Sequence, residues 1–223
     1  MLSKTNLCLL CAFLLLGYLV HNPVMAQNFA QWEKEISALE QANKVNSAGK
    51  KGIVFTGSSS IRLWEGLPQY FPGKNILNHG FGGSQTDEVA HFADRLITNY
   101  KPKQVVIYVG DNDIAAGKSP EKVFADFKSL FNKIRESTPK ANITFISIKP
   151  SPSRKQYYSA IQETNSLVKN FLESHKKTAF VDVYTPMLGS NGKPKPELFR
   201  PDSLHMTKAG YDIWARVLKP YLK

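Results

Sequence analysis

The sequence predicts an α/β protein in which helices cover both faces of a five-stranded parallel sheet. Short apolar runs rich in β-branched residues recur along the chain, and each ends at glycine or polar residues. Segments with apolar residues at helical spacing separate these runs. Because parallel strands need crossover connections, which are usually helical, this alternation favours a parallel sheet with helices on its two faces.

Five segments have the composition and length of buried strands. Their apolar residues follow one another with little alternation, which is typical of strands that are covered on both faces. The expected strands are "GIVFTG" (52–57), "KNILNHG" (74–80), "QVVIYVG" (104–110), "NITFISIKP" (142–150) and "TAFVDVY" (178–184).

Helices are expected before the first strand, between the later strands and at the C-terminus. Ser84 with Asp87 forms a plausible capping pair for the second helix. Ser119 is expected to cap the third, with Pro120 at its first position. The expected helical segments are 29–45, 89–100, 123–134, 161–172 and 206–222. Together the elements predict a three-layer α/β/α sandwich with a five-stranded parallel sheet, of the flavodoxin-like type.

Residues 1–26 have the layout of a secretory signal peptide, with Lys4 followed by an apolar stretch from Leu7 to Val20 and a cleavage site after Ala26. A retained membrane anchor is disfavoured, because the apolar stretch is shorter than the about 20 residues that span a bilayer. We therefore expect an exported protein, periplasmic or extracellular, with one domain over residues 27–223 and no stable membrane insertion after cleavage.

The two cysteines and the charge exclude several classes of function. Cys8 and Cys11 both lie in the apolar stretch of the leader, so the mature chain has no disulfide, thiolate nucleophile or cysteine metal site. The 29 basic and 18 acidic residues give a net charge of +11. Such a charge could favour anionic polymers or lipid head groups, but scattered surface lysine explains it better, since there is no long basic run. No nucleic-acid-binding motif is present, and the oligomeric state stays open.

Four loops collect polar residues and glycines at one edge of the predicted sheet. In open parallel sheets the active crevice lies outside the carboxyl ends of the strands. The loops are "GSSS" (57–60), "HGFGGSQTDE" (79–88), "GDND" (110–113) and "DSLH" (202–205), the last of which precedes the C-terminal helix. They supply a serine, paired glycines, an asparagine and an Asp/His pair, which are the residue types that acyl transfer by a serine nucleophile requires.

Each of these features also has a purely structural interpretation. Serines after a strand are common turn and cap residues, and Asp202 alone would be an ordinary N-cap. Among the histidines, His205 has a carboxylate three residues before it, whereas His79 is as well explained by a structural hydrogen bond as by lining the site. Arg154, on the loop after the fourth strand, could bind an anionic substrate, although an exposed, solvated arginine is the simpler interpretation.

The four blocks "GSSS", "GFGGS", "GDND" and "DSLH" stand in the order found in the SGNH hydrolases, also called the GDSL esterase/lipase family, and the chain resembles that family over nearly the whole of residues 27–223. The resemblance implies a catalytic triad of Ser59, Asp202 and His205. It also implies an oxyanion hole formed by the residues Ser59, Gly83 and Asn112, although Gly82 could stand in place of Gly83.

Where the family usually has an aspartate before the nucleophile, this chain has Ser58, which affects local hydrogen bonding more than the triad. By this assignment Ser60 caps a helix and Ser58 belongs to a turn.

The resemblance implies a serine esterase that needs no metal and no organic cofactor, and the leader implies that it is exported. Export, the basic surface and the absence of an apolar lid-like segment favour a small-molecule or glycan ester with short acyl groups, such as an acetyl ester of a carbohydrate. Two alternatives use the same scaffold: an acyltransferase that passes the acyl group to a sugar hydroxyl, and a non-catalytic carbohydrate-binding module.

Overall fold

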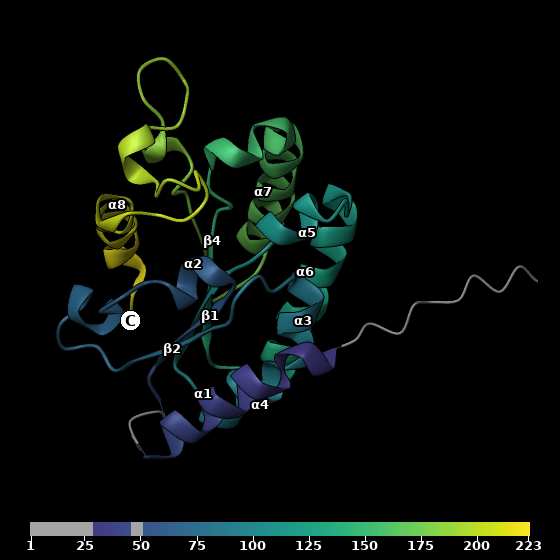
Figure 1. Cartoon of the computed structure of the whole chain (residues 1–223). Coiled ribbons are helices and arrows are strands. Elements are labelled where there is room, and N and C mark those ends of the chain that lie inside the picture. The colour runs from purple at the N-terminus through teal and green to yellow at the C-terminus, as the bar shows by residue number, and fades with distance from the viewer. Residues whose placement is uncertain (1–28, 46–50) are drawn as a thin grey trace, which may run out of the picture.

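The computed structural model describes residues 29–45 and 51–223 (Figure 1). The predicted signal peptide, residues 1–26, lies outside the described residues. Five parallel strands form one sheet in the order β2-β1-β3-β4-β5, which confirms the predicted α/β fold. The strands are β1 (Ile53–Gly57), β2 (Ile76–Gly80), β3 (Gln104–Tyr108), β4 (Asn142–Ile146) and β5 (Thr178–Val181).

Helices pack on both faces of this sheet and make the three layers (Figure 1). The α-helices are α1 (Glu33–Val45), α2 (Ser59–Arg62), α3 (Thr86–His91), α4 (Ala93–Leu96), α5 (Asp111–Ala115), α6 (Pro120–Ser137), α7 (Tyr158–Glu173) and α8 (Lys208–Leu218). Short 3-10 helices include η1 (Phe29–Trp32), η2 (Leu67–Tyr70), η3 (Thr98–Tyr100), η4 (Pro152–Tyr157), η5 (Thr185–Met187), η6 (Pro196–Leu198) and η7 (Lys219–Tyr221). Helices α1, α3, α6 and α7 cover one face, and α8 covers the other with the segment around α2 and η2.

The core is divided between the two faces by the alternation of side chains along each strand. In β3, Val105 and Ile107 belong to the cluster under α6 and α7, whereas Val106 and Tyr108 belong to the cluster under α8. All four are completely buried. An apolar run without polar alternation is therefore what a central strand of this sheet requires.

The sheet ends at one level on the side where the site residues lie. Gly57 at the end of β1 is in register with Gly80 of β2 and with Tyr108 of β3. The loops that follow these three strands therefore start side by side, as the crevice rule for parallel sheets predicts.

The region predicted as one helix over residues 89–100 consists instead of α3, α4 and η3. The helical backbone is interrupted at Phe92 (φ −87°, ψ 8°) and again at Ile97 (φ −128°, ψ −66°). The side chains of both residues are nevertheless buried. The apolar spacing thus identified the buried face correctly, but it does not report the breaks.

The predicted cap of this region is also wrong, whereas the cap of α6 is confirmed. The residue before α3 is Gln85, whose backbone N–H donates to Glu88 Oε2 at 2.7 Å. Ser84 Oγ instead donates to the carbonyl of Phe81. At α6, Ser119 Oγ accepts from the backbone N–H of Lys122 and Pro120 occupies the first helical position, as expected.

Over the part of the chain that the structure describes, none of the helices combines the length and the apolar composition that crossing a bilayer would require.

Candidate active site

The turn after β1 places Ser59 at the carboxyl edge of the sheet. Gly57 has φ +128°, and a Cβ there would lie 1.9 Å from the carbonyl oxygen of Tyr108, so only glycine fits. The next residue, Ser58, donates its backbone N–H to the same carbonyl at 3.1 Å. Helix α2 then begins at Ser59, which is partly exposed at the edge of the sheet.

Of the other two serines of this block, Ser58 lies in the turn between β1 and α2 as expected, whereas Ser60 has a role that differs from the one expected. Ser60 was expected to cap the helix, but it is the second residue of α2 and only 2% exposed, and the Tyr211 hydroxyl donates to its carbonyl at 3.0 Å. The N-cap position belongs to Ser58, which is buried and makes no side-chain capping bond. The prediction that Ser60 is the cap is therefore wrong.

Ser59, His205 and Asp202 form a continuous hydrogen-bonded chain. His205 Nε2 lies 2.9 Å from Ser59 Oγ, and His205 Nδ1 lies 2.6 Å from Asp202 Oδ2. When Nδ1–H donates to the carboxylate, Nε2 is the acceptor nitrogen and can take the proton of the serine hydroxyl. The three side chains thus have the mutual geometry of a nucleophile, a general base and a residue that orients the base.

Asp202 is fixed in place by its own turn. Its Oδ1 accepts the backbone N–H groups of Leu204 and His205, both at 2.9 Å. Burial alone would raise the pKa of Asp202, but the hydrogen bonds from the His205 side chain and from these two amides outweigh it and lower the pKa to about 2. The carboxylate therefore stays ionised throughout the ordinary pH range.

The loop that carries Asp202 and His205 is tightly built. The backbone N–H of Arg200 donates to the carbonyl of His205 at 2.7 Å. Ser203 adopts φ +56°, an unusual conformation for a serine. Its carbonyl accepts the N–H of Ser153, which ties the loop to η4 at 3.1 Å. The segment after the fourth strand thus lies against this loop.

The loop after β2 is hydrogen-bonded both to the end of β1, next to the Ser59 loop, and to Asn112. The backbone N–H of Phe81 donates to the carbonyl of Gly57 at 2.9 Å. Asn112 Nδ2 donates to the carbonyl of Ser84 at 3.1 Å. Hydrogen bonds on either side of Gly82 and Gly83 thus connect the loop of these two glycines with Asn112 and with the end of β1.

The two candidate glycines differ in the state of their amides. The N–H of Gly82 donates to Glu35 Oε1 at 3.2 Å, so it is already engaged by α1. Gly83 is exposed with φ +71°, and its N–H has no acceptor among residues 29–45 and 51–223. This geometry favours Gly83 over Gly82 as a donor to a substrate oxygen.

A buried ion cluster that the sequence did not reveal surrounds Asp111, the residue before Asn112. Lys149 Nζ lies 3.1 Å from Asp111 Oδ2 and 3.2 Å from the Tyr108 hydroxyl, and its side chain is 1% exposed. Burial disfavours the ammonium, but Tyr108 and Asp111 outweigh this effect and raise the pKa of Lys149. Arg154 Nε donates to Asp111 Oδ1 at 2.9 Å. The expectation that Arg154 is a solvated surface residue is therefore wrong, because its partner lies 43 positions away in the sequence.

His79 does not belong to the Ser59–His205 cluster. It is completely buried, its Nδ1 hydrogen-bonds to the carbonyl of Leu96, and its ring packs against Tyr100. Burial lowers the pKa of His79, although the bond to Leu96 opposes this. Of the two interpretations left open by the sequence, the structural hydrogen bond is the one observed.

The carboxylates of Asp87, Asp113 and Asp126 lie within 4.8 Å of one another, a spacing that could suit a metal ion. Lys118 Nζ lies among them, at 2.7 Å from Asp87, 3.1 Å from Asp113 and 3.2 Å from Asp126. This lysine supplies the positive charge that such a cluster requires, so the cluster is explained as an ion network joining α3, α5 and α6.

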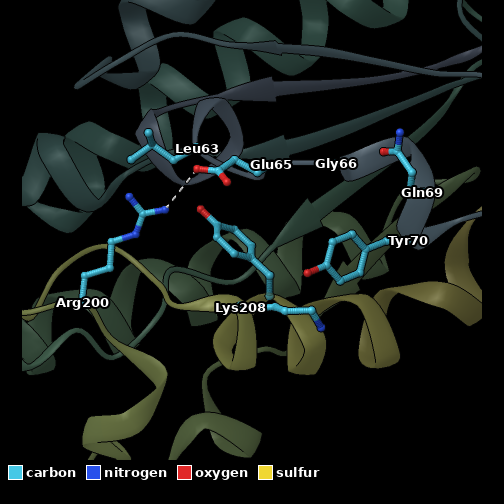
Figure 2. A pocket seen from close by; sticks show the side chains of 8 residues that line it. Leu63, Glu65, Gly66, Gln69, Tyr70, Arg200 and Lys208 are labelled. Atoms are coloured by element: carbon cyan, nitrogen blue, oxygen red, sulfur yellow. Dashed lines mark ion pairs between the residues drawn. The ribbon is translucent and has the colours of Figure 1, made fainter.

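A pocket of about 390 Å³ lies beside the site, between the segment 63–70 and the start of α8 (Figure 2). Arg200 extends across it toward Glu65, with Nη2 3.8 Å from Glu65 Oε1. Two of the lining residues also contact the site loops, since Arg200 bonds to His205 and Tyr211 bonds to Ser60. The pocket is therefore connected to the loops of Ser59 and His205 through these two residues, but neither Ser59 nor His205 lines it.

Comparisons with known proteins agree with this fold. A family model described as the GDSL-like lipase/acylhydrolase family matches residues 51–213. No curated protein sequence matches the chain. A solved structure from Bacteroides thetaiotaomicron, a GDSL-like lipase, is 25% identical with a TM-score of 0.68, over 87% of this chain and 96% of that one.

Two further solved structures are similar in fold. A protein of Streptococcus pneumoniae, provisionally named a platelet activating factor, has a TM-score of 0.76 at 23% identity, over 87% of this chain and 94% of that one. A catalytic mutant of an acetylxylan esterase from Geobacillus stearothermophilus has a TM-score of 0.61 at 17% identity, over 76% of this chain and 93% of that one.

Proposed function

Because the chain belongs to the GDSL-like lipase/acylhydrolase family and is therefore an ester-hydrolysing enzyme, we propose that it cleaves carboxylic esters through an acyl-enzyme on Ser59. The observation that carries this proposal is the pair of contacts made by His205, at 2.9 Å to Ser59 Oγ and 2.6 Å to Asp202 Oδ2. Membership of a family of hydrolases also argues against the alternative of a non-catalytic carbohydrate-binding module.

In the first half of the reaction, Ser59 Oγ attacks the ester carbonyl while His205 Nε2 takes the hydroxyl proton. Asp202 stabilises the imidazolium that forms. The N–H groups of Ser59 and Gly83 and the side chain of Asn112 donate to the oxyanion. Collapse of the tetrahedral intermediate breaks the bond to the alcohol oxygen, and His205 gives its proton to the leaving alcohol.

In the second half, water attacks the acyl-enzyme. His205 accepts a proton from this water, a second tetrahedral intermediate forms, and its collapse breaks the bond to Ser59 Oγ. The proton returns from His205 to Ser59, the carboxylic acid leaves, and the enzyme is restored. No step needs a group beyond the side chains and amides named here.

The proposed substrates are esters of short acyl groups, with acetyl esters of carbohydrates as the preferred class. The fold is shared with an acetylxylan esterase, and the sequence has no apolar lid-like segment that would favour long acyl chains. We further propose that the protein is exported, on the basis of the leader in residues 1–26. A panel of p-nitrophenyl esters graded by chain length, run beside acetylated xylan, tests the acyl preference.

The substitution Ser59→Ala tests the nucleophile. We expect turnover of p-nitrophenyl acetate to fall by at least about 10³-fold, and labelling by a fluorophosphonate probe to disappear. Ser166→Ala, which changes an exposed serine of α7, is the matched control and should keep both properties. A folded Ser59→Ala variant that retained the wild-type rate would overturn the proposal.

A further inference from the structure

The ion cluster beside Asn112 carries an unbalanced positive charge. Asp111 is shared by two cations, with Lys149 on Oδ2 and Arg154 on Oδ1. The third contact, the Tyr108 hydroxyl, is neutral, because burial raises the pKa of this phenol. No other carboxylate in residues 29–45 and 51–223 forms an ion pair with either cation. Two positive charges thus share one negative charge.

Arg154 provides the accessible part of this excess charge. Its Nε is engaged by Asp111, but within the described residues Nη1 and Nη2 have no hydrogen-bond acceptor. The Arg154 side chain is 21% exposed, whereas those of Lys149 and Asp111 are only 1% and 5% exposed. A guanidinium held along one edge keeps its two terminal nitrogens available as a fork for a carboxylate or phosphate group.

The position of Arg154 relates this fork to the chemistry. The preceding residue, Ser153, is bonded to Ser203, which lies between Asp202 and His205. The partner Asp111 directly precedes Asn112. Arg154 therefore lies between the loop that carries the proposed general base and the loop that carries the proposed oxyanion donor.

We propose that Arg154 forms an anion subsite, which binds a carboxylate or phosphate group on the alcohol portion of the ester substrate. The inference rests on the function proposed above. The alcohol portion is the relevant one because His205 protonates the leaving oxygen, and Arg154 is fixed to the loop of His205. The substrate class is thus an ester of an alcohol that carries a negative charge, such as an acylated acidic sugar or an acylated sugar phosphate.

Three acetyl esters built on the same ring test this subsite: 4-acetoxybenzoate, 4-acetoxyphenyl phosphate and the neutral 4-acetoxybenzamide. The quantity compared is the ratio of kcat/KM for a charged ester to kcat/KM for the neutral one. Arg154→Gln should lower this ratio by about 10-fold or more for at least one charged ester, since a charge-assisted hydrogen bond is lost. In the wild type, the charged ester with the larger ratio shows whether the subsite prefers a carboxylate or a phosphate group.

The matched control is Lys155→Gln, which removes a positive charge from an exposed neighbour on the same segment and should leave the ratio unchanged. Arg154→Lys should keep part of the preference for the charged esters, because the lysine ammonium still supplies a positive charge. Because the ratio is taken within one protein, a loss of active fraction cancels. A ratio that is the same in wild type and Arg154→Gln for both charged esters would overturn the inference.

A measurement on the wild type alone covers the case in which the Arg154 variants do not fold. Inhibition of 4-acetoxybenzamide hydrolysis by 4-hydroxybenzoate and by 4-hydroxyphenyl phosphate is compared with inhibition by 4-hydroxybenzamide. At least one charged alcohol should bind more tightly than the neutral one, and equal inhibition constants would contradict the subsite. Neutral-ester turnover that persists unchanged in Ser59→Ala would instead contradict the proposed function, so the two failures are distinguishable.

Discussion

At the scale of a single side chain, Asn112 has one observed hydrogen bond and one proposed role, as a donor to the oxyanion. Its amide donates one hydrogen to the carbonyl of Ser84, and this bond fixes the direction of the second hydrogen. An amide that is already oriented loses little freedom when a charge develops opposite it, which is the condition for effective oxyanion stabilisation.

We therefore expect Asn112→Ala to lower kcat for p-nitrophenyl acetate by about 10²–10³-fold. The measurement is steady-state kinetics at saturating ester, with Asn132→Ala on the exposed face of α6 as the control for loss of an asparagine. An unchanged kcat would remove Asn112 from the oxyanion hole.

The proximity of three proposed site side chains could be predicted from the sequence, whereas several contacts around them could not. Ser59, Asp202 and His205 were assigned from four short blocks, and the structure places them within hydrogen-bonding distance. The roles of Gly82 and Gly83 could not be separated in advance, because the difference lies in a bond to Glu35 on a distant helix. The ion pairs of Asp111 depend in the same way on contacts 38 and 43 positions apart, which no local pattern reports.

The turn between β1 and α2 shows how a short element positions Ser59, the proposed nucleophile. Gly57 combines a positive φ with a contact to Tyr108 that would be far too close for any side chain. Gly73 also has a positive φ, at +78°, but a Cβ there would meet no atom within 4 Å. A comparison of alanine substitutions at the two glycines therefore distinguishes the destabilisation caused by the positive φ from the destabilisation caused by the clash with Tyr108.

Gly57→Ala should reduce the free energy of unfolding by more than about 2 kcal/mol, since backbone strain and steric overlap act together. Gly73→Ala should cost about 1 kcal/mol, from the conformation alone. Urea denaturation followed by tryptophan fluorescence measures both. Equal losses in the two variants would show that the contact with Tyr108 relaxes freely.

At the level of elements, the prediction succeeded where burial alone determines the pattern. All five strands were found, because nearly every residue of β1 to β4 is buried, and β5, although only partly buried over 178–180, is also rich in apolar residues. The helix expected over 89–100 is broken at Phe92 and Ile97. Such breaks keep the same side chains in the core, so the apolar spacing does not distinguish a broken helix from a continuous one.

The stability of the whole molecule should depend on pH through His79. Burial lowers the pKa of His79 in the folded protein relative to its ordinary value, so the unfolded chain binds this proton more readily. The resulting stabilisation is complete above about pH 6.5 and is lost as the pH falls below that value.

The free energy of unfolding, measured by urea denaturation between pH 7.5 and pH 5, should therefore decrease toward acid. His79→Leu lowers the stability at every pH, through the lost bond to Leu96, but should give a flatter dependence on pH. His175→Gln, which changes an exposed histidine, is the control and should retain the wild-type slope. Parallel curves for wild type and His79→Leu would refute this role.

The distance along the chain between the two halves of the proposed triad has a consequence for biosynthesis. Ser59 follows the first strand, and His205, 146 positions later, comes just before the last helix. During translation the amino-terminal strands can begin to fold early, yet the proposed nucleophile meets its proposed base only after residue 205 has left the ribosome. On the proposed assignment, a polypeptide released before residue 205 has been added is hydrolytically silent.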